Sequence, residues 1–482
     1  MESDETSTSA DRSLETEDVR ASDRRYDCLD DAARLARRYL DGLGVRPVGA
    51  EAGLGEMRAV LARPLTDEGE DPSVIIESLA RDVGPGLVAS GGPRYFGFVI
   101  GGALPVAVAA DWLVSAWDQN GGGFPAAPSL SVVEEVAAGW VRELLGVPAS
   151  SGVGFVTGCQ MANVTCLAAA RHAVLRDAGW HVETRGLHGA PRIRVLAGEY
   201  AHVTIGVACR LLGLGGLVDV VPADDQGRMR ADALEEALTG GAGGPTIVCA
   251  QAGEIHTGAF DPFVDIARVC REHAAWLHVD GAFGLWVAAS PRRRTLLAGA
   301  EQADSWATDG HKWLNVPYDC GIAVVTDPQA HRAAMTSTSA YVPAHADDVP
   351  YGLDWTPEFS RRARGVPVYA ALRQLGRRGL ADLVDRCCDH ARLIAGRLAA
   401  EPGIEIVNDV VLNQVLVRFG DDDGCTDTVI EQVQRDGTCW LAGSTFRGRR
   451  VMRISVVGWQ TTAADAHRSA DAIISAARVP GC

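Results

Sequence analysis

The chain has 482 residues, of which 47% are hydrophobic and 22% charged, a composition that supplies a large apolar core and excludes a disordered or fibrous protein. Its net charge of −17 argues against a general nucleic-acid or anionic-membrane binder, because phosphate groups require a basic surface. The sequence contains no apolar run of membrane-spanning length, and its acidic start lacks the basic-then-apolar order of a signal peptide, so a cytoplasmic location is expected.

The N-terminal part of the chain divides into a polar tail and a helical segment. Residues 1–25 are rich in Ser, Thr, Asp and Glu and are predicted to form a disordered acidic tail. Residues 26–125 are predicted to be an N-terminal helical segment, because apolar residues recur there at helical spacing. Its expected helices are residues 27–43, 73–80 and 109–117.

Residues 126–360 are predicted to form a large α/β domain. Short, almost continuously apolar runs alternate there with amphipathic segments, which is typical of a mostly parallel sheet covered by helices on both faces. The expected strands are residues 154–157, 193–197, 217–221, 246–250, 276–279, 305–307 and 321–325, and the expected helices are residues 132–145, 162–177, 203–212, 231–238 and 262–273. A ligand of such a sheet binds at the carboxyl ends of the strands.

Residues 361–482 are predicted to form a smaller α+β domain. A long helical region runs to about residue 400, and shorter apolar runs alternate with helical patterns beyond it. The expected strands are residues 404–407, 414–419 and 451–456, and the expected helices are residues 426–434 and 463–476.

The twelve cysteines include no C-x-x-C pair and no Cys/His group at the spacing of a zinc site. Most lie in apolar segments, where a reduced cysteine behaves as a small hydrophobic residue. The sequence therefore predicts structural thiols rather than a disulfide framework, and no metal site.

One position stands apart in the composition, because the 45 basic residues are 44 arginines and a single lysine, Lys312. Surface charge alone can be supplied by either residue. Arginine stays protonated, whereas a desolvated lysine amine can lose its proton and form a Schiff base. Lys312 is therefore expected to have a chemical role, the alternative being that it survives by chance in a biased composition.

Three segments at predicted strand ends carry groups suited to one cofactor. Thr157, Gly158, Cys159 and Gln160 lead from a strand into a helix, whose N-terminal amides can hold a phosphate, although the glycine alone is also typical of any turn. Asp280 ends a buried strand, where it is a helix cap, a salt-bridge partner or a functional carboxylate. His311 and Lys312 follow another strand. A phosphate cradle, an anion and a lysine are the requirements of pyridoxal phosphate.

The segment 303–321, Ala-Asp-Ser-Trp-Ala-Thr-Asp-Gly-His-Lys-Trp-Leu-Asn-Val-Pro-Tyr-Asp-Cys-Gly, resembles the His-Lys signature of the group II pyridoxal-phosphate-dependent amino acid decarboxylases, which include the aromatic-L-amino-acid and glutamate decarboxylases. The resemblance extends over about residues 27–479. It implies the aspartate-aminotransferase-like fold of fold-type I, with a large sheet domain and a smaller C-terminal α+β domain, and pyridoxal 5'-phosphate as cofactor. It also implies a homodimer whose N-terminal helices embrace the neighbouring subunit.

The same resemblance implies roles for single residues. Lys312 is the Schiff-base lysine, Asp280 the partner of the pyridine nitrogen, and His202 the histidine that stacks on the cofactor ring. His311 lies on the phosphate side, and Ala282 packs against the other face of the ring. Phe98, in an aromatic segment that begins at Pro93, and Asn120 lie near the substrate pocket.

The chain departs from the family's pattern at several positions. Cys159, Gln160 and Met161 replace small or hydroxyl residues in the cradle, which leaves Thr157 and backbone amides as phosphate donors. Glu254 and His256 stand where relatives carry threonine or asparagine, so they either line the substrate pocket or face a loop. A loop tyrosine supplies a proton in many relatives; the nearest candidate here is Tyr351, and the next is Tyr341.

The predicted activity is decarboxylation of a free L-amino acid to the corresponding amine through a Schiff base at Lys312. Oxidative deamination to an aldehyde and carbon–carbon lysis are the alternatives on the same scaffold. A scaffold without cofactor is disfavoured by retention of the only lysine in the His-Lys position. Arg447 and Arg453 are possible anchors for a second substrate carboxylate, although surface positions are typical of arginines in a chain this rich in them.

Overall fold

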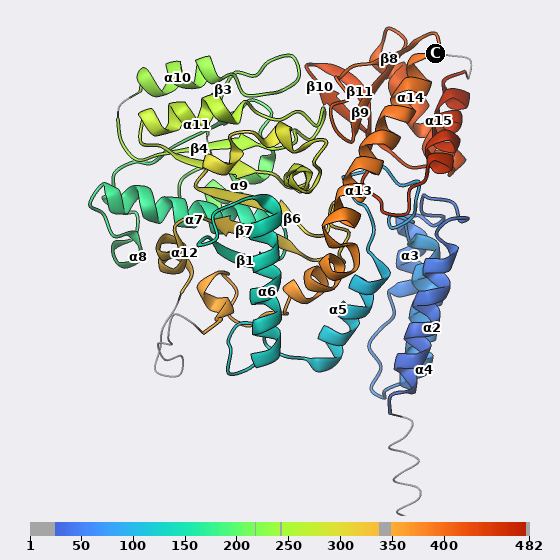
Figure 1. Ribbon diagram of the computed structural model, residues 1–482. Helices are drawn as coiled ribbons and strands as arrows, with labels where there is room; N and C mark the ends of the chain where they lie inside the picture. Colours follow the sequence, from blue (N-terminus) through green and yellow to red (C-terminus); the bar gives the residue numbers. More distant parts are fainter. Residues whose placement is uncertain (1–24, 217, 242, 337–348, 479–482) are drawn as a thin grey trace, which may run out of the picture. The chain divides into compact units, whose positions relative to one another are not determined.

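The computed structural model describes residues 25–216, 218–241, 243–336 and 349–478 and contains two compact units, one ending at Ala89 and the other beginning at Ser90. Figure 1 shows the elements of both units in chain colours. The predicted disordered tail lies almost wholly outside these ranges, as do Tyr341 and Leu217. Among the described residues, no helix has both the length and the apolar character needed to cross a bilayer.

The first unit consists of helices α2 (Asp27–Gly42), α3 (Leu54–Leu61) and α4 (Pro72–Val83). The Asp71 side chain caps α4 by accepting the Ser73 N–H at 2.9 Å. None of the three helices has a buried residue in the single chain, and apolar side chains such as Leu54 and Val74 are 68% and 53% exposed. The unit therefore presents uncovered apolar surface.

A seven-stranded sheet forms the centre of the second unit, in the order β1-β7-β6-β5-β4-β2-β3. The strands are β1 (Gly152–Val156), β2 (Arg194–Gly198), β3 (Asp219–Val221), β4 (Thr246–Gln251), β5 (Trp276–Asp280), β6 (Ser305–Asp309) and β7 (Gly321–Val325). Strands β3, β2, β4, β5 and β6 are parallel, and β7 is antiparallel to both of its neighbours. The predicted mostly parallel α/β sheet is thereby confirmed.

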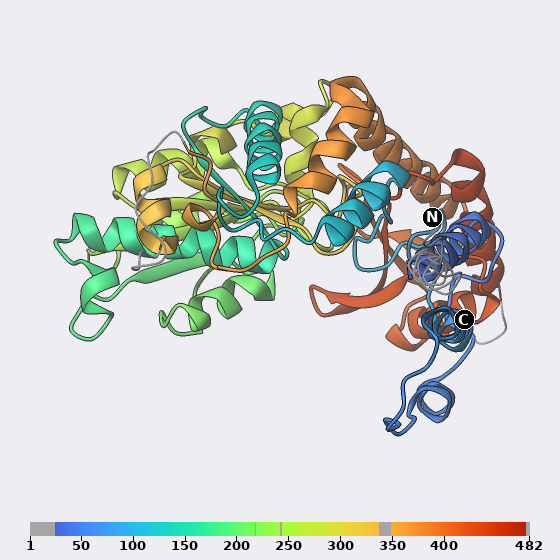
Figure 2. The same ribbon diagram turned by 90° about the horizontal axis from the view of Figure 1, so that it is seen from below.

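Helices cover both faces of this sheet, as Figure 2 shows. Successive residues of a strand enter opposite cores: Trp306 belongs to one buried cluster and Ala307 to the other. This alternation between two apolar layers explains why the strands read as continuous apolar runs. The helices of the unit's first 250 residues are α5 (Pro105–Trp117), α6 (Pro128–Leu145), α7 (Cys159–Asp177), α8 (Val182–Arg185), α9 (Val203–Leu211), α10 (Ala231–Thr239), α11 (Phe263–Glu272) and α12 (Pro328–Met335).

A second, antiparallel sheet has the order β10-β11-β9-β8. Its strands are β8 (Ile404–Ile406), β9 (Gln414–Phe419), β10 (Ala442–Phe446) and β11 (Arg449–Ser455), accompanied by helices α14 (Asp423–Asp436) and α15 (Ala463–Ala477). The long helix α13 (Gly365–Ala399) precedes it and is interrupted at Gly376, where φ is 59°. The smaller α+β region is therefore confirmed, and β10 is the strand that the sequence did not predict.

Ten of the described cysteines are free thiols, as expected. Cys425 differs, because it is disulfide-bonded, so the expectation of reduced thiols is wrong at that position.

Candidate active site

The sheet brings the three strand-end segments together. Cys159, the first residue of α7, has its thiol 3.5 Å from Asp280 Oδ1 and its amide nitrogen 2.6 Å from Asp309 Oδ1. Lys312 Nζ lies 3.4 Å from Asp309 Oδ2. The parallel register produces this convergence, because Asp280 pairs with Gln251 on one side and with Ala307 on the other, so these strand ends share one edge.

Asp280 is a buried carboxylate without a cationic partner. It is 6% exposed, and it accepts hydrogen bonds from Asn163 Nδ2 and from the Ala282 amide, both at 3.1 Å. No basic side chain of the described ranges lies within ion-pair distance of it. A buried anion is costly unless a positive group compensates it, so the position suits a cationic ligand group.

A buried hydrogen-bond relay supports Asp280 from behind. Asn163 donates to Asp280 through Nδ2, and its Oδ1 lies 2.9 Å from His278 Nε2, which therefore carries the imidazole proton. His278 Nδ1 lies 2.9 Å from Ser305 Oγ, which accepts a bond from Trp276 Nε1 at 3.0 Å. Burial lowers the pKa of His278 to about 4, so its ring is neutral.

Sequence reasoning missed both members of this relay. The available signal was His278 itself, because it lies two residues before Asp280 on one strand and so shares its face. Nothing in the sequence pairs it with Asn163.

His311 and Lys312 follow β6 on a tight turn. The Cys320 amide donates to His311 Nδ1 at 3.1 Å, so the imidazole proton is on Nε2, which faces Asp309 Oδ1 at 3.4 Å. The His311 ring stacks on Tyr318 with centroids 4.3 Å apart, and burial lowers the pKa of His311. Lys312 has 18% of its side chain exposed, which leaves its amine accessible beside these groups.

The turn between β1 and α7 contains the residues for which a phosphate cradle is predicted. Gly158 lies against Gly321, where an added Cβ would come within 2.3 Å of the Gly158 carbonyl carbon, so the two backbones touch. The first amides of α7 have no acceptor within the helix. The Cys159 amide is taken by Asp309, whereas Thr157 is half-buried and Gln160 exposed beside it.

His202 is the N-cap residue of α9, and its Nδ1 faces Thr204, 2.9 Å from Oγ1 and 3.4 Å from the amide nitrogen. Partial burial lowers the pKa of His202, while Asp280 raises it and Lys312 lowers it. Both charges of the site therefore act on this imidazole, which is neutral at physiological pH.

Aromatic rings and one arginine lie near these residues, since Arg453 acts on His202 and Tyr318 acts on Tyr95. Tyr95 stacks on Trp440 with centroids 5.0 Å apart, and Phe98, 57% exposed, lies 5.5 Å from the same indole. Burial and the neighbouring Tyr318 raise the pKa of Tyr95 to about 12. Arg453 is half-buried and donates weakly to the Ile255 carbonyl at 3.4 Å; no carboxylate of the described chain pairs with it.

Burial lowers the pKa of Arg453, whereas Glu254 and Tyr95 raise it. Its half-buried place in the aromatic group differs from the surface position that is typical of arginines in this chain. By sequence, Arg453 and Arg447 are equal candidates for binding a second substrate carboxylate. Their burial differs, because Arg453 is half-buried and Arg447 is exposed.

The other predicted substrate residues are engaged by their own loops. Glu254 accepts bonds from the His256 and Thr257 amides at 2.8 and 2.7 Å, and His256 bridges Glu254 Oε1 at 2.5 Å and Ser444 Oγ at 2.9 Å. Asn120 Oδ1 accepts the Gly122 amide at 2.9 Å. These side chains hold their own loops in place through hydrogen bonds to backbone amides and to each other. Their contact with a substrate stays a prediction.

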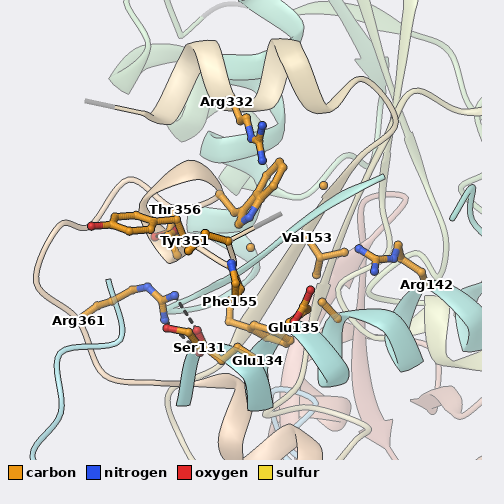
Figure 3. Close-up of a pocket in the computed structure, with 17 residues that line it drawn as sticks. Ser131, Glu134, Glu135, Arg142, Val153, Phe155, Arg332, Tyr351, Thr356 and Arg361 are labelled. Carbon is orange, nitrogen blue, oxygen red and sulfur yellow. Dashed lines mark hydrogen bonds and ion pairs between the residues drawn. The ribbon is translucent and has the colours of Figure 1, made fainter. Parts of the chain in front are cut away.

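Tyr351 lies in a different hollow, shown in Figure 3. This cavity of about 190 Å³ lies beside β1, and the buried ion pair of Arg361 and Glu134 (2.7 Å) forms part of its wall. Tyr351 also packs against Gly123. Lys312, Asp280 and His202 are not among the residues that line this cavity, and the role of Tyr351 as a proton donor stays a prediction.

The residues present fit pyridoxal phosphate. The uncompensated Asp280 carboxylate suits a protonated pyridine nitrogen, and Lys312 supplies an accessible amine. The amides of Gln160 and Met161 begin α7 beside the cradle glycines. The carboxylate of Asp309, which accepts the Cys159 amide at the same helix end, has a charge that opposes a phosphate.

Comparison with known proteins identifies the family of the chain. Residues 55–419 match the family model described as the pyridoxal-dependent decarboxylase conserved domain. The chain is 28% identical over 416 residues to tryptophan decarboxylase 1 of Oryza sativa subsp. japonica, covering 80% of each protein. It is 26% identical over 433 residues to the aromatic-L-amino-acid decarboxylase of Mus musculus, covering 87% of this chain and 90% of the relative.

The fold is similar to the crystal structure of Oryza sativa TDC with PLP and tryptamine, with a TM-score of 0.87, 24% identity, and coverage of 94% of this chain and 98% of that one. The match of the family model covers most of the chain. The chain therefore belongs to the pyridoxal-dependent decarboxylase family and is a pyridoxal-phosphate-dependent amino acid carboxy-lyase.

Proposed function

We propose that the protein converts an aromatic L-amino acid into the corresponding amine, with Lys312 as the amine that attaches the cofactor. The observation that carries this proposal is the placement of the only lysine, whose Nζ lies 3.4 Å from Asp309 and which acts, together with the Asp280 carboxylate, on the His202 imidazole. When bound, pyridoxal phosphate supplies a sink for the electron pair left at the substrate Cα when its bond to the carboxylate breaks.

The protein's own groups divide the remaining work. Asp280 holds a proton on the pyridine nitrogen by its negative charge, and the Asn163–His278 relay keeps that carboxylate oriented. His202 is neutral with Nδ1 turned to Thr204, so Nε2 carries a proton and can donate it toward a bound substrate. Tyr351, Thr157 and Ala282 keep their predicted roles as parts of this proposal.

Two features support the substrate class. Tyr95 stacks on Trp440, and Phe98 lies tilted against the same indole. Tyr318, whose charge acts on Tyr95, stacks on His311, so this aromatic group lies near the His-Lys segment. The relatives named above act, by their names, on tryptophan and aromatic amino acids. Arg453, which pairs with no carboxylate in the described chain, provides a cation for the carboxylate of the substrate.

The test is incubation of the holoenzyme with a pooled set of amino acids, followed by mass spectrometry of the products, beside a Lys312→Ala control. The expected product is an amine at the mass of one aromatic substrate minus carbon dioxide, absent from the control. An aldehyde would contradict the amine route, and an amine from a non-aromatic substrate would contradict the substrate class alone.

We also propose that the protein is a homodimer. The support is the first unit, whose three helices bury none of their own apolar side chains in the single chain. Light scattering at the elution peak should give twice the monomer mass of 50.9 kDa, and a monomeric mass would refute it. A cytoplasmic location belongs to the same proposal, supported by the ten free thiols.

A further inference from the structure

The carboxylate of Asp309 lies at the N-terminal end of α7, where the sequence predicts the phosphate cradle. Asp309 is the last residue of β6 and is 2% exposed. Its Oδ1 accepts the amide of Cys159, the first residue of α7, at 2.6 Å. A helix N-terminus attracts anions, so this carboxylate and the cofactor phosphate are directed to the same amides.

Few positive groups offset this anion. Lys312 Nζ lies 3.4 Å from Oδ2, and the neutral His311 presents Nε2–H at 3.4 Å from Oδ1. The charge of Asp309 acts on the Cys159 thiol and on the side chains of His202, Tyr318 and Cys320, and the second carboxylate, Asp280, acts on Cys159 and His202 as well. Within the described ranges no arginine pairs with Asp309, so Lys312 is its only full cation.

Cofactor binding changes this balance. The amine that offsets Asp309 is the same amine that attaches the cofactor in the proposed function, while the phosphate adds a second anion at the same helix end. Two anionic oxygens in a buried site repel strongly unless a proton lies between them. One proton shared by a carboxyl and a phosphate oxygen converts the repulsion into a short, charge-assisted hydrogen bond.

We infer that Asp309 binds the cofactor phosphate through a shared proton, so that loading the protein with cofactor takes up one proton from solvent that an asparagine at this position would not require. This inference rests on the proposed function, because it places the phosphate at the cradle of Gly158 and Cys159. An asparagine would keep the bond to the Cys159 amide through its carbonyl oxygen and offer an amide N–H to the phosphate in place of the proton.

The test measures protons and affinity rather than turnover. Isothermal titration of the apoprotein with pyridoxal phosphate, in buffers of different ionisation enthalpy, counts the protons taken up. We expect Asp309→Asn to take up one proton fewer than the natural protein. The dissociation constant of the natural protein should rise about tenfold more per pH unit than that of Asp309→Asn, since one extra proton is linked to binding.

Asp319→Asn is the matched control, because it removes the same charge from the same segment, at an exposed residue paired with Arg364. It should take up as many protons as the natural protein. Equal proton uptake by the natural protein and Asp309→Asn would overturn the inference.

A second measurement covers the case in which Asp309→Asn does not fold. Pyridoxal has no phosphate, so its binding to the natural protein should take up one proton fewer than the binding of pyridoxal phosphate. Both proton counts are corrected for the titration of the free ligand. Equal corrected counts would overturn the inference. Failure of the natural protein to bind pyridoxal phosphate at Lys312, seen as an absent absorbance change, would instead refute the proposed function.

Discussion

Acid should destabilise this protein through His278, the buried histidine behind Asp280. Its pKa is about 4 in the folded chain because burial disfavours the charged ring, against an ordinary value of 6.5. The folded pKa is depressed, so the stabilising contribution is fully present above pH 6.5 and is lost as pH falls from there toward 4. The difference between the two pKa values corresponds to about 3 kcal/mol of unfolding free energy at neutral pH.

Replacing His278 by glutamine removes the titration while keeping a side chain that can bond Asn163 and Ser305. Urea unfolding, followed by tryptophan fluorescence at several pH values, gives the free energy of unfolding for both proteins. Between pH 6.5 and 4 the natural protein should lose about 1.4 kcal/mol more per pH unit than His278→Gln. The test compares only the slopes of unfolding free energy against pH, so a lower stability of His278→Gln at neutral pH does not affect the result.

Two other histidines provide comparisons. His331 is fully buried, bonds the Trp355 carbonyl at 3.1 Å and has a pKa of about 4, so His331→Gln should reduce the acid slope similarly. His188 is exposed, and His188→Gln should leave the slope unchanged. An acid slope in His278→Gln equal to that of the natural protein would refute the assignment of a neutral, buried His278.

Three further predictions concern the site and its support. Arg453→Gln should raise KM for the amino acid at least tenfold with a smaller change in kcat, because it loses a charge-assisted bond to the substrate carboxylate; an unchanged KM would exclude that role. Gly321→Ala should weaken cofactor binding, measured by absorbance titration, since its Cβ would meet the Gly158 carbonyl carbon at 2.3 Å, and unaltered affinity would contradict this packing. Arg361→Met should lower the free energy of unfolding, measured with urea, by about 3–5 kcal/mol, because it leaves the buried Glu134 without its ion-pair partner. The double variant Arg361→Met/Glu134→Gln should regain part of this free energy, and no gain would argue against the ion pair as the cause.

Hydrophobic patterning was sufficient for most of the fold. Strands β7 and β9 have the predicted bounds: β7 is apolar along its whole length, β9 has an apolar run between Gln414 and Arg418, and both strands are buried on both faces. Strand β10 was missed because Ala442, Gly443 and Ser444 carry little apolar surface. It exists through its antiparallel pairing with β11, a contact that local sequence does not encode.

The sequence alone determined which residue types could do the chemistry. A single lysine among 45 basic residues identified Lys312, and strand-end positions identified Asp280 and the turn at Gly158. These inferences can be made from the sequence because composition and strand periodicity are local properties of the chain. Parallel strands then bring their carboxyl ends to one edge whatever the details of packing.

Only the tertiary structure decided how those groups are partnered. It showed that Asp280 pairs with no basic side chain of the described ranges, that Asn163 and His278 support it, and that Asp309 accepts the Cys159 amide. Hydrogen bonds of this kind join residues more than a hundred positions apart. Their geometry depends on strand register and helix packing at the level of single ångströms, which no local pattern of side chains specifies.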